Sequence, residues 1–294
     1  MKINAPILII YNANAGQRRK DMFFEILHEL DNKLVKYDVI KTEFAGHGEV
    51  IARDMSQINE VKTIVAAGGD GTINEVLNGM RASAKPLGII PLGTANVLAK
   101  ELGIKINAMD IAEVLMRAHI SSLYVATIND QIFSLMASVG YDAGAVKNVN
   151  IKLKKKVGEA AYVFSFIREL IMAPKIAYNI EVDGNIHYAY GAIITNGKFY
   201  GGKYICAPDA SIKENKLHAI LFKKSGAIQA IKYFWAIVNN TLYKSAEIEV
   251  FEVDSVEISS NHEAPVQIDG DYFGELPVKI GLIERPVSII CSKT

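Results

Sequence analysis

The chain has 294 residues, of which 50% are hydrophobic and 22% charged, and its 32 basic side chains balance 32 acidic ones. This composition excludes a disordered chain, and the length predicts two domains. The neutral balance excludes a global attraction to nucleic acid or to an anionic bilayer. Cys206 and Cys291 form no disulfide framework or thiolate zinc pattern. Since we find no signal-peptide pattern and no apolar run of about 18 residues, we expect a cytoplasmic protein.

Short apolar runs alternate with helical patterns over the first 105 residues. Apolar residues recur at helical spacing from Met22 to Leu34, between two strand-like runs. Strands alternating with helices at this spacing predict a parallel sheet with helices on both faces. The predicted strands are 7–11, 37–42, 61–67 and 87–90, and the predicted helices are 22–34, 50–58, 72–80 and 94–102.

The pattern changes near residue 120, where hairpin signals appear at 129–130 and 183–185. We expect an α/β domain at 1–121 and a β-rich, antiparallel sandwich with inserted helices at 122–294, the last strand being free to return to the first domain. The helices are predicted at 158–171 and 227–242. The strands are predicted at 123–128, 131–137, 176–182, 187–195, 217–222, 248–253, 256–259, 265–268 and 278–283.

The strongest local signal is a glycine-rich turn, GGDGT at 68–72, between a buried strand and a helix. Glycines let main-chain N–H groups approach a ligand closely, and a helix N-terminus favours phosphate. The turn is neither a Walker A loop, because GxxxxGK[ST] is absent, nor a dinucleotide fingerprint, because Asn74 stands in place of the third glycine.

Asp70 is the informative residue of this turn, because a carboxylate repels a bound phosphate. Either it caps the helix, which Asp does well, or it works with a cation or on a proton. Two further strand-to-helix turns, 12–16 and 91–96, carry Asn12, Thr94 and Asn96. Three such turns at one edge of a parallel sheet predict a site for a nucleoside triphosphate, although each alone is also typical of helix capping.

Taken together, GGDGT at 68–72, PLGTAN at 91–96 and IDGD at 268–271 resemble the diacylglycerol kinase catalytic domain, and most closely the bacterial lipid kinases that are similar to sphingosine kinases. The GGDG motif is shared with NAD kinases and phosphofructokinases. The resemblance extends over nearly the whole chain. It implies an ATP-binding α/β domain of the phosphofructokinase and NAD kinase type, a β-rich lipid-substrate domain, and phosphate transfer to a lipid hydroxyl.

The resemblance also implies site residues. Asp271 stands where such enzymes carry a Glu proposed as proton acceptor, and Asp70 would act with it; a plain hairpin turn is the alternative for 269–271. Magnesium would be held by the Glu214 carboxylate and the main-chain carbonyls of Ser211 and Lys216, in the loop 211–218 where relatives usually carry Asp-Gly. Gln17 and Val97 also depart from the usual Lys and Asp. The residues expected to contact ATP are Asn12, Gly16, Thr42, Gly68, Gly69, Asp70, Gly71, Thr72, Ile73, Asn74 and Thr94.

Three other features have two interpretations each. The basic run at 152–156 is either a solvated loop or a contact with anionic lipid. The helix that carries Tyr233, Phe234, Trp235 and Ile237 forms either plain core or the wall of an acyl-chain pocket. Asp142 is either a turn residue or an anchor for a substrate head group.

The sequence therefore predicts a lipid kinase that depends on ATP and magnesium and contacts a membrane surface transiently. Its acceptor would be diacylglycerol or a related long-chain alcohol, and nucleic acid is not expected as a partner. An NAD kinase-like enzyme and a nucleotide- or lipid-binding protein without catalysis are the alternatives. The choice of acceptor and the oligomeric state, a homodimer included, stay open.

Overall fold

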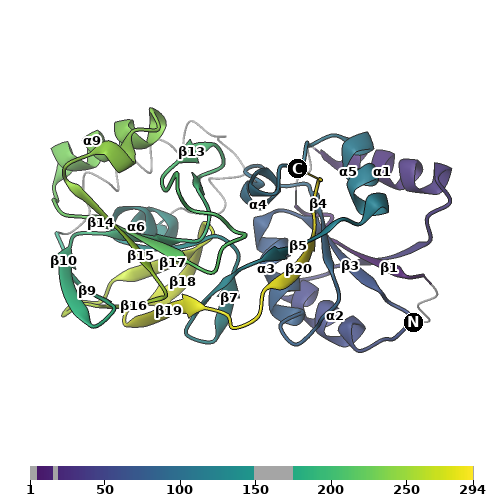
Figure 1. Cartoon of the computed structure of the whole chain (residues 1–294), viewed down its shortest axis with the longest axis horizontal. Coiled ribbons are helices and arrows are strands. Elements are labelled where there is room, and N and C mark those ends of the chain that lie inside the picture. The colour runs from purple at the N-terminus through teal and green to yellow at the C-terminus, as the bar shows by residue number, and fades with distance from the viewer. Residues whose placement is uncertain (1–4, 16–18, 149–174, 294) are drawn as a thin grey trace. The chain divides into compact units, whose positions relative to one another are not determined.

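The computed structural model describes residues 5–15, 19–148 and 175–293. The chain divides into two compact units (Figure 1). The first contains Met1–Val125, Gln131–Ser134 and Ile283–Thr294, and the second contains Ala126–Asp130 and Leu135–Leu282. The second unit is thus inserted between elements of the first.

A six-stranded, mostly parallel sheet forms the centre of the first unit, with strand order β2-β1-β3-β4-β20-β5. The last strand of the chain, β20, pairs parallel with β4 and antiparallel with β5. Strands β3 and β4 are almost entirely buried, as expected for parallel strands covered on both faces. The strands are β1 (Ile7–Tyr11), β2 (Tyr37–Lys41), β3 (Thr63–Gly68), β4 (Leu87–Pro91), β5 (Ile120–Leu123) and β20 (Val287–Ile290).

Helices cover both faces of this sheet. α1 packs against α5 and α2 packs against α3, and the two pairs lie on opposite sides (Figure 1). α1 buries Phe23, Ile26 and Leu30, which recur at the spacing of one helix face. The helices are α1 (Lys20–Asn32), α2 (His47–Ser56), α3 (Asp70–Gly79), α4 (Val97–Glu101) and α5 (Ala108–Arg117). The predicted α/β architecture is confirmed.

Two antiparallel sheets form the second unit, which confirms the predicted sandwich. One sheet contains, in spatial order, β10 (Asn185–Ala189), β9 (Tyr178–Val182), β16 (Ser255–Ser259), β19 (Val278–Leu282), β6 (Ala126–Ile128) and β7 (Gln131–Phe133). The other contains β15 (Ile248–Val253), β14 (Leu217–Phe222), β11 (Ala192–Thr195), β8 (Met136–Val139), β17 (Pro265–Ile268) and β18 (Asp271–Glu275). The short strands β12 (Phe199–Tyr200) and β13 (Tyr204–Ile205) pair with each other, and β7 (Gln131–Phe133) belongs to the first unit.

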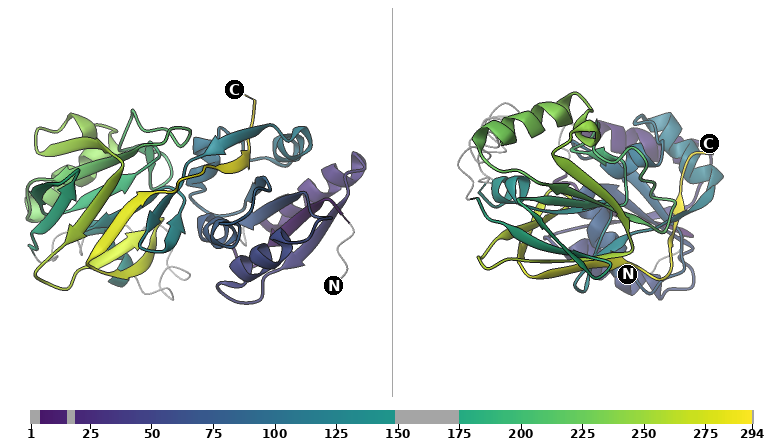
Figure 2. Two further views of the ribbon diagram at one scale, coloured as in Figure 1. Left: turned by 60° about the horizontal axis from the view of Figure 1, so that its bottom comes forward. Right: turned by 60° about the vertical axis from the view of Figure 1, so that its left-hand side comes forward.

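Helices of the second unit lie on the outside of these sheets (Figure 2). α6 (Tyr141–Asn148) packs against β8, β17 and β18, whereas α9 (Ala227–Val238) precedes a short 3-10 helix, η2 (Leu242–Lys244). α9 places Tyr233 in a buried cluster with Phe222, Cys206 and Leu242. Among the described residues, no helix is long and apolar enough to cross a bilayer.

Several sequence predictions need correction. The run predicted as one strand at 187–195 forms two strands in different sheets, because the chain turns at Tyr190 and Gly191, where the Tyr190 N–H donates to the carbonyl of Phe222. Leu34 lies beyond the end of α1 with φ +57° and is 89% exposed, so it is not part of the helix face. Helix α5 was not predicted.

The helix predicted at 94–102 is also shorter than expected, beginning only at Val97. Asn96 precedes it with φ +48°, in the left-handed region, which interrupts a helix. The predicted helix at 158–171 and the basic run at 152–156 lie outside the described residues.

Candidate active site

Three parallel strands bring the predicted ligand-binding turns together at one edge of the first sheet. β1, β3 and β4 are neighbours, and their register places Tyr11 opposite Ala67 and Gly68 opposite Pro91. The turns that follow these strands therefore begin side by side. This edge, at the carboxyl ends of the strands, is where an open α/β sheet binds its ligand.

Hydrogen bonds tie the three turns to one another. Nδ2 of Asn12 donates to Oγ1 of Thr72 at 3.0 Å, and the main-chain N–H of Asn12 donates to the Ala67 carbonyl at 2.9 Å. The N–H of Leu92 donates to the Gly68 carbonyl at 2.8 Å. Three residues expected to contact ATP, Asn12, Gly68 and Thr72, therefore belong to one bonded cluster.

At two positions in this cluster only glycine fits, because neighbouring atoms lie too close to leave room for a Cβ atom. A Cβ on Gly68 would lie 2.4 Å from Oγ1 of Thr72, and a Cβ on Gly93 would lie 2.7 Å from the Cα of Gly69. Gly69 is also the N-cap residue of α3 and has no side chain to accept from the first N–H groups of that helix. A bound anion can serve as their acceptor.

Asp70 has a structural partner that the sequence did not reveal. Its Oδ1 accepts a hydrogen bond from the main-chain N–H of Val97 at 3.0 Å, so it caps α4, whereas the N-cap residue of its own helix is Gly69. The side chain is half-buried. The first turn of α4 thus offsets part of the carboxylate charge, and Asp70 joins the first glycine-rich turn to the second.

The second turn presents a buried amide and an exposed hydroxyl. Asn96 is fully buried, and its Nδ2 donates to the Gly93 carbonyl at 2.8 Å, while its Oδ1 accepts no hydrogen bond from a described residue. Thr94 is exposed at the same turn. Arg19 reaches this edge from the start of α1, donating from Nη1 to the Pro91 carbonyl at 3.4 Å. The edge therefore carries a cation as well as the Asp70 carboxylate.

Glu75 is a residue of this region that sequence reasoning missed. Its Oε1 accepts from the N–H of Gly46 at 2.8 Å, and its Oε2 accepts from the N–H of Gly48 at 3.0 Å. This carboxylate holds the start of α2 against α3, next to the loop that begins at Thr42. Thr42 itself is buried, and its N–H donates to the Tyr11 carbonyl at 2.9 Å. The available signal in the sequence was an acidic residue in the helix that follows the glycine-rich motif, three positions after Thr72.

The remaining expected ATP contacts differ in accessibility. Gly71 is exposed at the start of α3, whereas the side chains of Ile73 and Asn74 are buried on the same helix. Ile73 is fully buried, so its side chain belongs to the core and only its main chain can reach a ligand. Gly16 lies outside the described residues, as does Gln17.

In the second unit, the predicted base lies next to a tight hairpin turn. Asp269 and Gly270 have φ values of +47° and +89°, which are typical of the two central residues of a type I′ turn. Oδ1 of Asp269 accepts from the N–H groups of Leu135 at 3.0 Å and Met136 at 2.9 Å. Asp271 follows the turn as the first residue of β18 and is exposed. The segment thus forms a hairpin turn that leaves the Asp271 carboxylate accessible, and the catalytic role of Asp271 stays a prediction.

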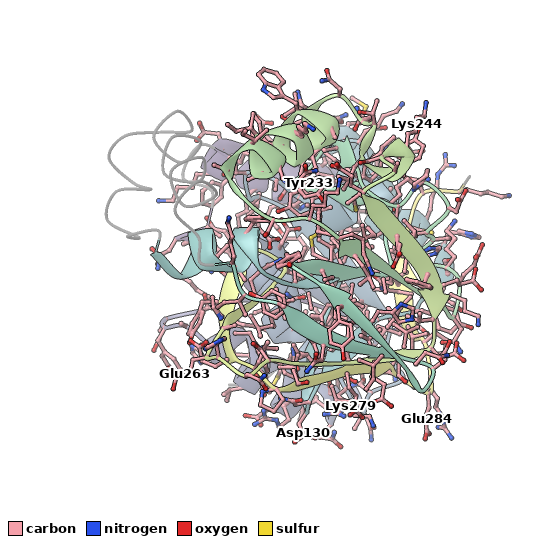
Figure 3. All side chains as sticks on the ribbon, turned by 90° about the vertical axis from the view of Figure 1, so that its left-hand side faces the viewer. Asp130, Tyr233, Lys244, Glu263, Lys279 and Glu284 are labelled. Carbon is pink, nitrogen blue, oxygen red and sulfur yellow. The ribbon has the colours of Figure 1, made fainter. Side chains whose placement is uncertain are left out.

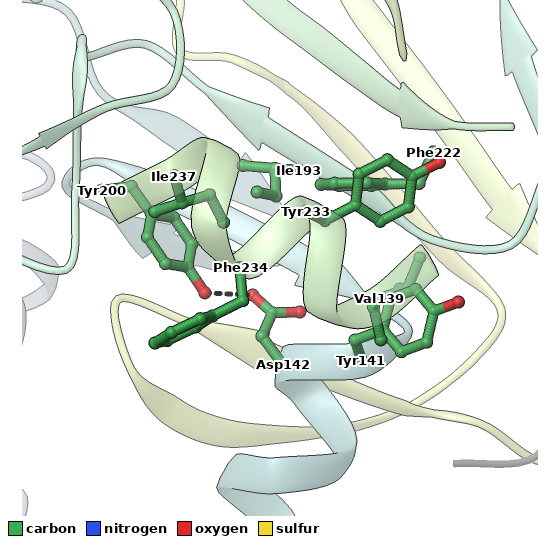
Figure 4. A pocket seen from close by; sticks show the side chains of 10 residues that line it. Val139, Tyr141, Asp142, Ile193, Tyr200, Phe222, Tyr233, Phe234 and Ile237 are labelled. Atoms are coloured by element: carbon green, nitrogen blue, oxygen red, sulfur yellow. Dashed lines mark hydrogen bonds between the residues drawn. The ribbon is translucent and has the colours of Figure 1, made fainter. Parts of the chain in front are cut away.

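Asp142 lies in a buried polar cluster beside a small cavity of about 30 Å³ (Figure 4). Its Oδ2 accepts from Oγ of Ser138 at 2.6 Å and from the Tyr200 hydroxyl at 3.0 Å, and its Oδ1 accepts from the N–H of Ala143 at 2.9 Å. Burial raises the pKa of the Asp142 carboxyl above 3.8, although these donors oppose the rise. A plain exposed turn residue would have neither the burial nor the donors.

Gln267 connects this cluster to the hairpin turn. Its Nε2 donates to Oγ of Ser138 at 2.7 Å and to Oδ2 of Asp142 at 3.5 Å, and its Oε1 accepts from the N–H of Gly270 at 2.7 Å. Gln267 is buried and was not predicted as functional. The available signal in the sequence was that Gln267 is a polar residue inside the apolar, strand-like run 265–268.

The other lining of the cavity is mostly apolar and aromatic. Tyr233, Phe234 and Ile237 of α9 line it together with Phe222 and Ile193. Trp235, in contrast, is 57% exposed on the other side of the helix. Both interpretations of this helix therefore hold in part: Tyr233 is buried in the core and, with Phe234 and Ile237, lines the cavity. Trp235 does neither.

The residues expected to hold magnesium offer few free ligands. The Ser211 carbonyl accepts from the N–H of Glu214 at 2.9 Å, and Glu214 is exposed. The side chain of Lys216 is a cation that pairs with Asp254 at 3.0 Å, so only the main-chain carbonyl of this residue could bind a metal. Among the described residues, no three or more His, Cys, Asp or Glu side chains form a group that could hold a metal. One carboxylate and an engaged carbonyl do not fit a tightly held magnesium ion, and the assignment stays a prediction.

Comparison with known proteins covers both units. Residues 6–128 match the diacylglycerol kinase catalytic domain, and residues 136–291 match the YegS C-terminal NAD kinase beta sandwich-like domain. A diacylglycerol kinase of Bacillus subtilis (strain 168) is 26% identical over 97% of this chain and 96% of its own length. One of Staphylococcus carnosus (strain TM300) is 24% identical over 97% and 94%. A solved structure from Bacillus anthracis strain Sterne has the same fold, with a TM-score of 0.82, 24% identity, and coverage of 99% of this chain and 96% of that one.

The fold and the two matched regions define a kinase of two domains, an α/β catalytic domain and a β-sandwich. The chain belongs to the diacylglycerol kinase catalytic-domain family of lipid kinases, with the YegS type of C-terminal domain.

Proposed function

We propose that this lipid kinase transfers the γ-phosphate of ATP to the hydroxyl of a membrane lipid alcohol, with diacylglycerol as the first candidate acceptor. The observation that carries the proposal is the bonded cluster of three strand-to-helix turns in the first unit, in which Asn12, Gly68 and Thr72 meet. The diacylglycerol kinases of Bacillus subtilis and Staphylococcus carnosus, similar over nearly the full length, support the choice of acceptor.

ATP would bind along this edge of the sheet. The N-terminus of α3 at Gly69 to Thr72 supplies main-chain donors to the phosphates, and Arg19 adds a cation. Thr42 and Thr94 flank the cluster from the neighbouring loops. Magnesium accompanying ATP would neutralise phosphate charge, and Asp70 is the carboxylate that the cluster offers to it.

Asp271 would act as the general base. The acceptor oxygen forms a bond to the γ-phosphorus while its proton passes to the Asp271 carboxylate, and the bond from that phosphorus to the bridging oxygen breaks to release ADP. Asp271 is exposed at the start of β18, as this role requires. The turn before it is held by Asp269 and Gln267, which restricts where the carboxylate can lie.

The test is the transfer of labelled γ-phosphate from ATP to a panel of acceptors, with diacylglycerol, monoacylglycerol and a sphingoid base in mixed micelles and NAD in buffer. We expect label in a lipid product and none in NADP. Label in NADP without any lipid product would replace the proposal with an NAD kinase, which the description of the matched C-terminal domain makes the relevant rival.

Asp271→Asn tests the base, and Asp130→Asn serves as its control because Asp130 is also an exposed residue in a hairpin of this chain. We expect Asp271→Asn to lower kcat by about 10²-fold or more, as removal of a general base does. Asp130→Asn should leave kcat unchanged. Equal activity of both variants would remove Asp271 from the mechanism.

A further inference from the structure

Helix α9 exposes a stripe of large apolar side chains on its outer face. Ile228, Ile231 and Trp235 are 75%, 42% and 57% exposed, and their spacing of three and four residues places them on one side of the helix. Figure 3 shows side chains projecting outward from this helix at the edge of the second unit, whereas Tyr233 points inward. A contiguous exposed apolar stripe marks an interaction surface rather than the scattered exposure that is normal for single residues.

The opposite face of the same helix is already used. Ala230 and Tyr233 are buried, and both line the cavity together with Phe234 and Ile237. Packing against the sandwich therefore accounts for the apolar residues on the inner face of α9. It does not account for Ile228, Ile231 and Trp235 on the outer face. An amphipathic helix that is exposed on one face can insert its apolar side chains into the interface of a lipid bilayer, where polar head groups cover the acyl chains.

The surroundings of the stripe carry excess positive charge. Lys232 lies within the stripe, Lys175 lies beside Gly226 just before the helix, and Lys244 follows it in η2. No described residue forms an ion pair with any of these three lysines. The neighbouring carboxylates of Glu247 and Glu249 are paired at 3.0 Å, with Lys224 and Lys223 respectively. The pKa of Glu247 is lowered first by its hydrogen bond to Lys224 and also by the charge of Lys232.

We propose that the outer face of α9, defined by Ile228, Ile231, Lys232 and Trp235, docks on an anionic lipid bilayer. The helix would lie in the plane of the interface with its three apolar side chains at the boundary between head groups and acyl chains, and the lysines would contact anionic head groups. The inference deepens the proposed function, on which it rests, because an acceptor that resides in a bilayer requires the enzyme to reach that bilayer.

The chain provides its own probe, because Trp235 is its sole tryptophan. Its fluorescence is recorded while vesicles of phosphatidylcholine with phosphatidylglycerol are added, without ATP or acceptor. We expect the emission to shift to shorter wavelength and to be quenched by lipids brominated on their acyl chains. Vesicles of phosphatidylcholine alone should bind less tightly, and the difference should shrink at high salt. No shift and no quenching with anionic vesicles would overturn the proposal.

Ile228→Ser with Ile231→Ser keeps the probe and removes two apolar side chains. We expect the apparent vesicle affinity to fall by about tenfold or more. The control is Phe24→Ser with Leu34→Ser, two residues of the first unit that are 56% and 89% exposed; it should bind vesicles as the wild type does. Equal loss in both double variants would overturn the assignment to α9.

Two further measurements distinguish docking on a bilayer from self-association of the chain and from the proposed lipid kinase activity. A blue-shifted emission without lipid that depends on protein concentration would show that a second copy of the chain covers the stripe, and would overturn the bilayer assignment. Activity on a short-chain diacylglycerol dissolved as monomers tests the proposed function independently of any membrane. Activity there, without binding to vesicles, would refute only the docking surface, whereas vesicle binding without transfer to any acceptor would refute only the proposed function.

Discussion

The carboxylate of Asp70 and the main-chain N–H of Val97 are joined by a hydrogen bond of 3.0 Å. The bond connects the first residue of α3 to the first residue of α4, and therefore connects the turns that follow β3 and β4. It gives Asp70 a structural role in addition to any contact with ATP or its cation.

Substitution of Asp70 separates these two roles. Asp70→Asn keeps an oxygen that can accept from Val97 and removes the charge, whereas Asp70→Ala removes both. We expect Asp70→Ala to lower the free energy of unfolding by about 1 kcal/mol, as loss of a helix cap does, and Asp70→Asn to lower it much less. Both should lower kcat by about 10²-fold. Wild-type kcat in a stably folded Asp70→Asn variant would show that the charge has no part in transfer.

Glu75 holds the loop before α2 through two main-chain donors. Glu75→Gln leaves one oxygen and turns an amide nitrogen toward either Gly46 or Gly48, both of which donate. We expect a loss of about 1–2 kcal/mol in the free energy of unfolding and a higher KM for ATP, because this loop follows Thr42. The control is Glu49→Gln on α2, an exposed partner of Arg53, which should lose less than about 0.5 kcal/mol. Equal effects in the two variants would contradict the assigned role of Glu75.

Gln267 and Asp142 provide a test of coupling inside the sandwich. Gln267→Glu keeps the acceptor for Gly270 but brings a second carboxylate close to Asp142, whose Oδ2 lies 3.5 Å from Nε2 in the wild type. We expect the variant to be destabilised at pH 7 and the destabilisation to shrink as the pH is lowered, because the two carboxyl groups can then share a proton. Urea unfolding of the single and double variants would measure the coupling, and Asp142→Asn should restore stability to Gln267→Glu.

Asp142 alone gives a pH dependence of definite sign. Its pKa is raised by burial, so between 3.8 and the raised value the folded state binds more protons than the unfolded state. The contribution of Asp142 to stability is therefore most favourable below pH 3.8 and falls as the pH rises through the folded pKa. The difference in free energy of unfolding between wild type and Asp142→Asn should shift against the wild type over this interval. A difference that moves in the opposite direction would contradict the assigned environment.

The fold could be predicted from the sequence because the parallel sheet, its helices and the antiparallel hairpins each have a recognisable local sequence pattern. Alternating apolar runs and helical patterns predicted the parallel sheet, and the turns at 129–130 and 183–185 predicted antiparallel pairing. The start of α4 was not accessible, because the left-handed Asn96 and the Asp70 cap depend on a contact between residues 27 positions apart. The break at Tyr190 likewise depends on its bond to Phe222.

The site was predictable as far as strand order and motif allow. Because β1 and β3 are neighbouring parallel strands, the turns that follow them lie side by side and bring Asn12, Gly68 and Thr72 together. Glu75 and Gln267 escaped prediction because Glu75 binds main-chain groups 27 and 29 residues away and Gln267 binds the buried Ser138 of another segment. The roles of Asp271 in proton transfer and of Ser211, Glu214 and Lys216 in metal binding stay predictions.

The position of β20 has a consequence for how the protein can be made. This strand pairs with both β4 and β5, yet the whole second unit precedes it in the chain and is synthesised before it. The catalytic sheet therefore stays incomplete until the ribosome has translated the whole second unit, and β20 is the one neighbour of β5 in this sheet among the residues that the structure describes. A messenger truncated after the codon for Val125 would encode every turn of the ATP cluster but not the strand that joins β5 to their sheet.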